Sequence, residues 1–64
     1  MNWEQIKGNW NESKGKLRQQ YADLTDDELE HARGSQEELV GLIQQKYGKS
    51  KEDAEREIDR ATAP

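Results

Sequence analysis

Apolar residues recur along the chain at spacings of three and four positions, which is the period of an amphipathic helix. Val and Ile are the only β-branched apolar types, and neither occurs in the alternation typical of a strand. The pattern therefore predicts an all-α fold. The large apolar residues that can form its core are Trp3, Ile6, Trp10, Leu17, Tyr21, Leu24, Leu29, Leu39, Val40, Leu42, Ile43, Tyr47 and Ile58.

Start and stop signals divide the last two thirds of the chain into three helices. The segment Thr25-Asp26-Asp27-Glu28 has the sequence of a capping box, in which Thr and Glu side chains each bond a backbone amide. The sequence after Ser35 repeats this device, and the sequence after Ser50 is a looser version of it. Gly34 and Gly48 lie where C-terminal caps belong, because Gly adopts left-handed backbone at least cost. These signals predict helices over about 26–33, 36–47 and 51–62.

The first third of the chain predicts one further helix. Its apolar residues from Trp3 to Leu24 fall within an arc of roughly 60° on a helical wheel, forming one narrow stripe. Gly8 costs about 1 kcal/mol relative to Ala inside a helix. Asn9 offers an alternative start, with Glu12 three residues later as in a capping box. We favour a helix over about 9–22, with residues 2–8 either continuing it or forming a separate frayed turn.

The distribution of apolar residues predicts how the helices pack. The helix over 36–47 has the widest apolar face, so we expect it at the centre of the fold. The helix over 51–62 offers only Ala54, Ile58 and Ala61 to a core, so we expect it on the outside. Four short helices joined by short loops predict two helical hairpins packed on each other. We expect a single domain over 1–64, in which residues 1–8 are the part most prone to fraying.

Composition narrows the class of protein. Charged residues make up 38% of the chain, and the mean hydropathy is -1.40. No apolar run approaches the ~20 residues of a membrane span, the N-terminus lacks a signal-peptide pattern, and Cys is absent. These features predict a cytoplasmic monomer without membrane association. A formal charge of -4 argues against a nucleic-acid-binding protein, which usually carries a basic patch.

No residue pattern predicts catalysis, a cofactor or a bound metal. The acids Asp26, Asp27, Glu28 and Glu30 lack the spacing and the central Gly of a calcium loop. Favourable interaction with a helix N-terminus explains them better. His31 is the only histidine, and neither a nucleophile motif nor a second imidazole accompanies it. We therefore expect that the protein is not an enzyme and uses no cofactor.

One pattern suggests an interaction surface, which we call the N-terminal Trp/Lys face: Trp3, Lys7, Trp10, Lys14 and Arg18. On the helical wheel the three cations lie beside the tryptophan stripe. Such a face can stack on nucleic-acid bases, lie in a membrane interface or anchor a protein partner. A core stripe whose edge is covered by lysine stems explains the same spacing, and we favour that interpretation. The membrane and nucleic-acid versions are disfavoured by the acids within and beyond the segment.

Several motifs resemble the bacterial CsbD-like family of small, YjbJ-type helical proteins. The most specific are Leu24-Thr25-Asp26-Asp27 and the segment from Leu39-Val40-Gly41 to Tyr47-Gly48. The resemblance extends over about residues 2–60, and Ser13 departs from it where relatives often carry an aromatic residue. Further matching motifs are Asn9-Trp10, Lys14-Gly15-Lys16-Leu17, Tyr21, Gly34, Ile43-Gln44 and Ala54-Glu55.

The resemblance implies a cytoplasmic protein produced in general stress responses, with two crossed helical hairpins similar to a SAM domain. It implies no catalytic residues. We therefore expect a non-enzymatic stress-response protein that is protective or binds a macromolecule. An adaptor that binds an unknown protein partner through the N-terminal Trp/Lys face is the alternative, and a nucleic-acid-binding module is a weaker one.

Overall fold

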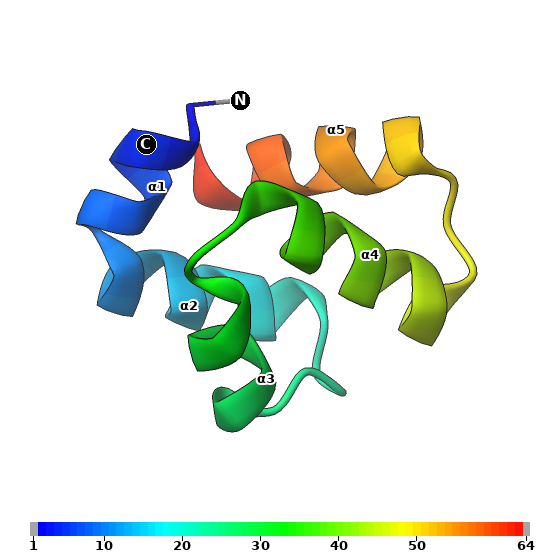
Figure 1. Cartoon of the computed structure of the whole chain (residues 1–64), viewed down its shortest axis with the longest axis horizontal. Coiled ribbons are helices and arrows are strands. Elements are labelled where there is room, and N and C mark those ends of the chain that lie inside the picture. Colours follow the sequence, from blue (N-terminus) through cyan, green and yellow to red (C-terminus); the bar gives the residue numbers. More distant parts are fainter. Residues whose placement is uncertain (1, 64) are drawn as a thin grey trace.

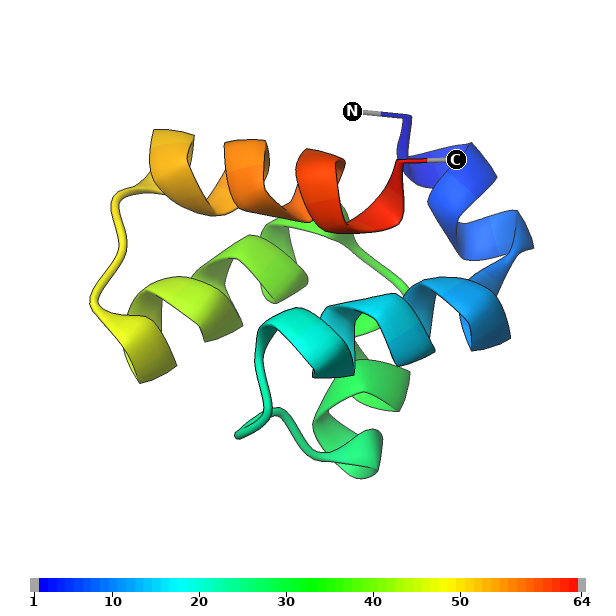
Figure 2. The ribbon, with the colours of Figure 1, turned by 180° about the vertical axis from the view of Figure 1, so that it is seen from behind.

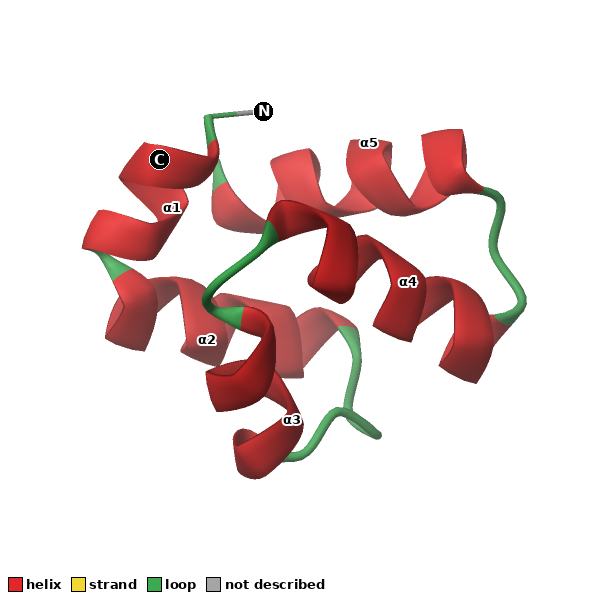
Figure 3. Cartoon of the chain, in the orientation of Figure 1, coloured by secondary structure: helices red, strands yellow, loops and turns green. Residues whose placement is uncertain are grey.

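The computed structural model describes residues 2–63, and this part of the chain forms helices joined by loops, without strands (Figure 1, Figure 3). The predicted all-α class is therefore confirmed. The described residues form five helices instead of the expected four, because the first six helical residues form a separate element. The helices are α1 (Trp3–Gly8), α2 (Trp10–Gln20), α3 (Asp26–Ala32), α4 (Gln36–Tyr47) and α5 (Lys51–Thr62).

The break between α1 and α2 lies at Asn9. The Asn9 backbone amide donates to the carbonyls of Gln5 and Ile6, which ends α1, and the same residue begins α2 without a side-chain capping bond. The helix therefore restarts at Asn9, as the alternative start predicted, but the side-chain bonds of a capping box do not form there. Ser13 is buried, and its hydroxyl donates to the Ile6 carbonyl at 3.1 Å, which joins the two helices. Residues 3–8 therefore form a separate element, as in one of the two alternatives, and positions on one helical wheel do not carry across the break.

The later helices begin and end close to the predicted residues. Thr25 and Glu28 form the full capping box, with bonds of 3.1 and 2.9 Å to each other's backbone amides. Gly48 ends α4 in the left-handed conformation, with φ of 66°. Gly34 does not play this role, because Gly48 is the only described residue with positive φ and α3 ends at Arg33 in right-handed backbone. The hydroxyls of Ser35 and Ser50 accept bonds from Glu37 and Asp53 amides.

The helices form two layers, with α3 and α4 on the side that faces the reader in Figure 1 and α2 and α5 on the side seen in Figure 2. As expected, α5 buries only one narrow face and keeps its charged residues at the surface, and this face packs against α2 and α4. Ala54 and Ile58 are fully buried at this contact. They lie one helical turn apart, so two well-placed side chains suffice to bury one face of an otherwise charged helix.

The core contains most of the predicted residues. Leu17, Leu29 and Ile43 are among the fully buried side chains, whereas Trp3, Leu42 and Tyr47 are partly buried against the core. The buried hydrophobic residues are Ile6, Trp10, Leu17, Tyr21, Leu24, Leu29, Ala32, Leu39, Val40, Ile43, Ala54 and Ile58.

A cluster of polar contacts at the end of α2 connects this part of the chain to α5. The Tyr21 hydroxyl donates to the Glu57 carboxylate of α5, and Lys49 lies 3.2 Å from the other oxygen of Glu57. Burial raises the pKa of the Tyr21 phenol, and the bond to Glu57 adds to this rise. That bond in turn holds the pKa of Glu57 below its ordinary value, with help from Lys49. The rings of Tyr47 and Tyr21 pack together with their centroids 4.8 Å apart. The hydroxyl oxygen of Tyr47 accepts a hydrogen bond from the backbone amide of Asp23 at 3.0 Å.

Candidate functional site

The two tryptophans of the N-terminal Trp/Lys face pack on each other inside the fold. Trp10 is 4% exposed and belongs to the core, while Trp3 is partly buried and packs edge-on against it, with ring centroids 5.9 Å apart. Both indole Nε1 atoms are buried, and neither has a hydrogen-bond partner within residues 2–63. The contact joins α1 to α2, so both rings contribute to packing.

The three cations of the same face differ in their contacts and in their exposure to solvent. Lys14 Nζ lies 2.8 Å from the carboxylates of Asp26 and Glu30, so it links α2 to the first turns of α3. The hydrogen bonds to these carboxylates raise the pKa of Lys14, and the bond from Lys14 lowers the pKa of Asp26. Lys7 is partly buried and Arg18 is exposed. A role of this face in binding stays a prediction. Within the fold, Trp10 is buried in the core and Lys14 forms ion pairs with α3.

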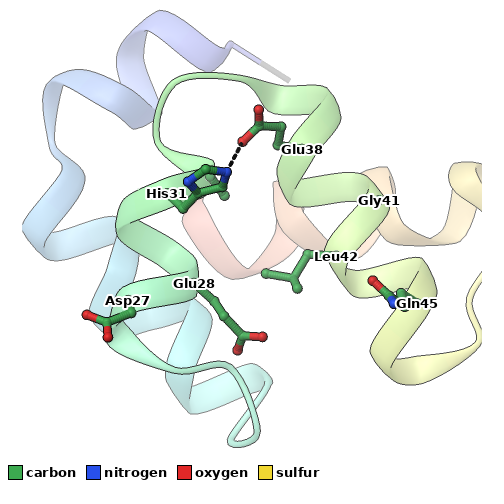
Figure 4. Close-up of a pocket in the computed structure, with 8 residues that line it drawn as sticks. Asp27, Glu28, His31, Glu38, Gly41, Leu42 and Gln45 are labelled. Carbon is green, nitrogen blue, oxygen red and sulfur yellow. Dashed lines mark ion pairs between the residues drawn. The ribbon is translucent and has the colours of Figure 1, made fainter.

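A groove of about 590 Å³ lies between α3 and α4, and we call it the α3–α4 groove (Figure 4). From α4, Leu42 points into the space between the two helices, and Glu28 points toward that space from α3. No sequence pattern predicted this groove, because it arises where two helices diverge. Its lining residues are Asp27, Glu28, His31, Ala32, Glu38, Gly41, Leu42 and Gln45.

The floor of the groove is apolar. Ala32 is 2% exposed, and Leu42 is partly buried against the core while part of its side chain remains open to the groove. Gly41 is exposed in the middle of α4, and a Cβ at this position meets no other atom within 4 Å. The fold therefore does not need Gly at 41 for close packing. The missing side chain leaves this part of the groove open.

The rim of the groove is acidic. Asp27 and Glu38 are exposed, and Glu38 Oε2 lies 3.6 Å from Nε2 of His31, itself 85% exposed. Glu28 forms a 2.6 Å ion pair with Lys46 of α4. The hydrogen bond from Lys46 lowers the pKa of Glu28, and the backbone of Thr25 contributes in the same direction. The rim thus presents two exposed carboxylates, Asp27 and Glu38, beside the Glu28–Lys46 ion pair.

The segment that forms α3 and α4 carries the net charge of the chain. Residues 26–47 hold six acids and two bases, which gives -4, the formal charge of the whole chain. The remaining residues hold eight acids and eight bases. Three of the six acids, Asp27, Glu28 and Glu38, line the groove. Asp26 and Glu30 instead pair with Lys14 of α2.

Residues 2–63 hold no group of three or more His, Asp or Glu side chains arranged to bind a metal ion. The helices in this part of the chain are also too short and too polar for any one of them to cross a membrane.

Comparison with known proteins identifies the family. A UPF0337 protein of Pseudomonas aeruginosa is 50% identical over 58 residues, which cover 91% of this chain and 89% of that protein. The UPF0337 protein YjbJ of Escherichia coli is 44% identical, over 92% of this chain and 86% of its own length. A UPF0337 protein of Nitrosomonas europaea is 48% identical over 92% of this chain, which spans only 63% of that longer protein.

No solved structure matches the chain. The family model described as CsbD-like matches residues 4–56, which include the motifs around Thr25 and Gly41. The chain belongs to the CsbD-like family.

Proposed function

We propose that this chain is a non-enzymatic bacterial stress-response protein that acts in the cytoplasm by binding a protein partner. The stress role is what the family resemblance implies. The observation that carries the binding role is the α3–α4 groove, an apolar floor beneath a carboxylate rim. Exposed apolar concavities with polar rims are typical of protein-binding surfaces.

The groove supports a protein partner more strongly than the alternatives. Nucleic acids and anionic membranes are repelled by the -4 charge that residues 26–47 carry. A bulk protective role through abundance draws support from the 38% charged composition, but it assigns no purpose to the groove. The arrangement of two crossed hairpins, similar to a SAM domain, also belongs to this proposal, and SAM-like folds serve diverse functions.

A second candidate is an adaptor that binds through the N-terminal Trp/Lys face. The unpaired indole N–H groups of Trp3 and Trp10 favour it, because a buried Trp N–H usually finds an acceptor. A partner that reaches Trp3 could supply one. This surface and the α3–α4 groove lie on different helices, so one experiment separates them.

Site-specific photocrosslinking in living bacteria tests both candidates. A photoreactive amino acid replaces Gln45 in the groove, Lys7 in the N-terminal face, or Arg56, which is exposed on α5 and serves as the control position. The proposal expects a discrete crosslinked protein from Gln45 under osmotic or stationary-phase stress, and none from Arg56. A discrete product from Lys7 alone supports the second candidate. The absence of a discrete product at all three positions contradicts partner binding and leaves the bulk protective role.

A further inference from the structure

We infer that the α3–α4 groove binds a basic amphipathic helix of a protein partner. This inference rests on the proposed function and names the partner's chemistry. The apolar face of such a helix contacts the floor formed by Leu42, Ala32 and Gly41, and its Lys or Arg side chains reach the carboxylates of Asp27 and Glu38.

The shape of the groove fits one face of a helix. Its volume of about 590 Å³ lies within the roughly 300–1,000 Å³ of ordinary ligand sites. The groove runs between two helices, where Figure 4 shows Leu42 reaching from α4 into the space and His31 contacting Glu38 at one end. A third helix laid between two diverging helices buries its apolar anchors at spacings of three and four residues. This arrangement covers Leu42, which the fold leaves partly exposed.

Charge determines which helix the groove accepts. Asp27 and Glu38 are exposed, and Glu38 has only the weak partner His31, so both can bind a cation from outside the chain. Lys46 is engaged with Glu28 and with the Asp23 carbonyl at 2.8 Å, so it does not neutralise the other two carboxylates. An acidic helix is repelled by this rim. A neutral apolar helix leaves the carboxylates desolvated without a partner, which is costly.

Gly41 allows the groove to be closed without disturbing the fold. A Cβ at this position meets open space, so Gly41→Leu adds a side chain that occupies the groove. The same change at Gly15 is a matched control, because Gly15 is also exposed within a helix and also meets nothing within 4 Å. Both substitutions improve helix propensity, so both variants should fold at least as well as the wild type. Only Gly41→Leu fills the groove.

Binding is measured by fluorescence anisotropy with a labelled model peptide that carries Leu on one helical face and Lys on the other. One control peptide replaces every Lys with Glu, and another has the Leu/Lys composition in an order without an apolar face. We expect the wild type and Gly15→Leu to bind the amphipathic Leu/Lys peptide alike and in preference to both controls. Gly41→Leu should weaken this binding at least about tenfold, because it removes the space for one anchoring side chain. Asp27→Asn with Glu38→Gln should weaken it about three- to twentyfold.

Equal binding of the Leu/Lys peptide by Gly41→Leu and the wild type would overturn the groove as its site. Equal binding of the ordered and disordered Leu/Lys peptides would show attraction by charge alone and would also overturn the inference. The photocrosslinking experiment distinguishes failure of this inference from failure of the proposed function. A discrete partner captured from Lys7 but not from Gln45 leaves partner binding intact and removes the groove, whereas capture from no position removes the proposed function itself.

Discussion

The fully buried position of Ile58 yields a prediction about how much α5 contributes to the core. If α5 contributed little, truncating its one large apolar side chain would have a small effect. In the structure Ile58 is 0% exposed, in the helix that packs against both α2 and α4. Ile58→Ala therefore removes apolar burial and leaves a cavity in the core.

The expected size of this effect is large relative to the stability of the whole chain. Ile-to-Ala changes at buried sites cost about 2–5 kcal/mol, and the better helix propensity of Ala recovers only a few tenths. A chain of 64 residues has a free energy of unfolding on the order of 3–10 kcal/mol. We therefore expect Ile58→Ala to remove between about a fifth and all of the stability.

Urea unfolding, followed by far-UV circular dichroism and by tryptophan fluorescence, measures the change. Trp10 is buried in the same core, so both signals should report one transition. Arg56→Ala is the control, because Arg56 is exposed in the same helix and its change should stay within about 0.5 kcal/mol. A loss of less than about 1 kcal/mol for Ile58→Ala would show that α5 does not contribute to the core in this way.

Three further substitutions test single contacts. Tyr21→Phe removes the hydrogen bond to Glu57 and should cost about 1.5–3 kcal/mol at neutral pH, measured by urea unfolding. Because the folded state raises the pKa of Tyr21, wild-type stability should fall as the pH rises above the ordinary value of 10.0, and Tyr21→Phe should lose much of this dependence. Because the folded state lowers the pKa of Glu57, the wild type should also lose stability as the pH falls below 4.5. Tyr21→Phe should lose stability less steeply over the same pH range. Equal slopes of stability against pH in the two proteins would contradict the assigned bond. Lys14→Gln should raise the pKa of Asp26 toward its ordinary value, followed by NMR titration, and an unchanged titration would refute the ion pair. Thr25→Ala should destabilise α3 by about 0.5–2 kcal/mol, seen as faster amide hydrogen exchange in that helix than in α5.

Features set by neighbouring residues were predictable from the sequence. The capping box at Thr25 and the left-handed cap at Gly48 act within one helical turn, so the ends of α3, α4 and α5 lie within about a residue of the predictions. Gly34 shows the limit of this reasoning. A Gly after a helix permits left-handed backbone but does not require it, and the short connection to α4 uses right-handed backbone instead.

Features set by contacts between distant residues were not predictable in the same way. Ser13, which departs from the family pattern, becomes buried because its hydroxyl bonds the Ile6 carbonyl across the break between α1 and α2. The partners of Lys14 lie more than ten residues away, on α3, so no helical wheel could place them. The α3–α4 groove depends on how two helices diverge, and the only local sign of it was Gly41 in the middle of a helix.

The confinement of the net charge to residues 26–47 has a consequence for the kinetics of encounter. A molecule whose net charge lies in one segment of its chain behaves as an electric dipole, so a cationic partner turns it before contact and meets the α3–α4 side first. Such orientation raises the association rate much more than it prolongs the bound state. It acts over roughly the Debye length of about 8 Å at physiological ionic strength. Rising salt concentration inside a cell under osmotic stress would therefore slow the capture of a partner while leaving the lifetime of complexes already formed largely unchanged.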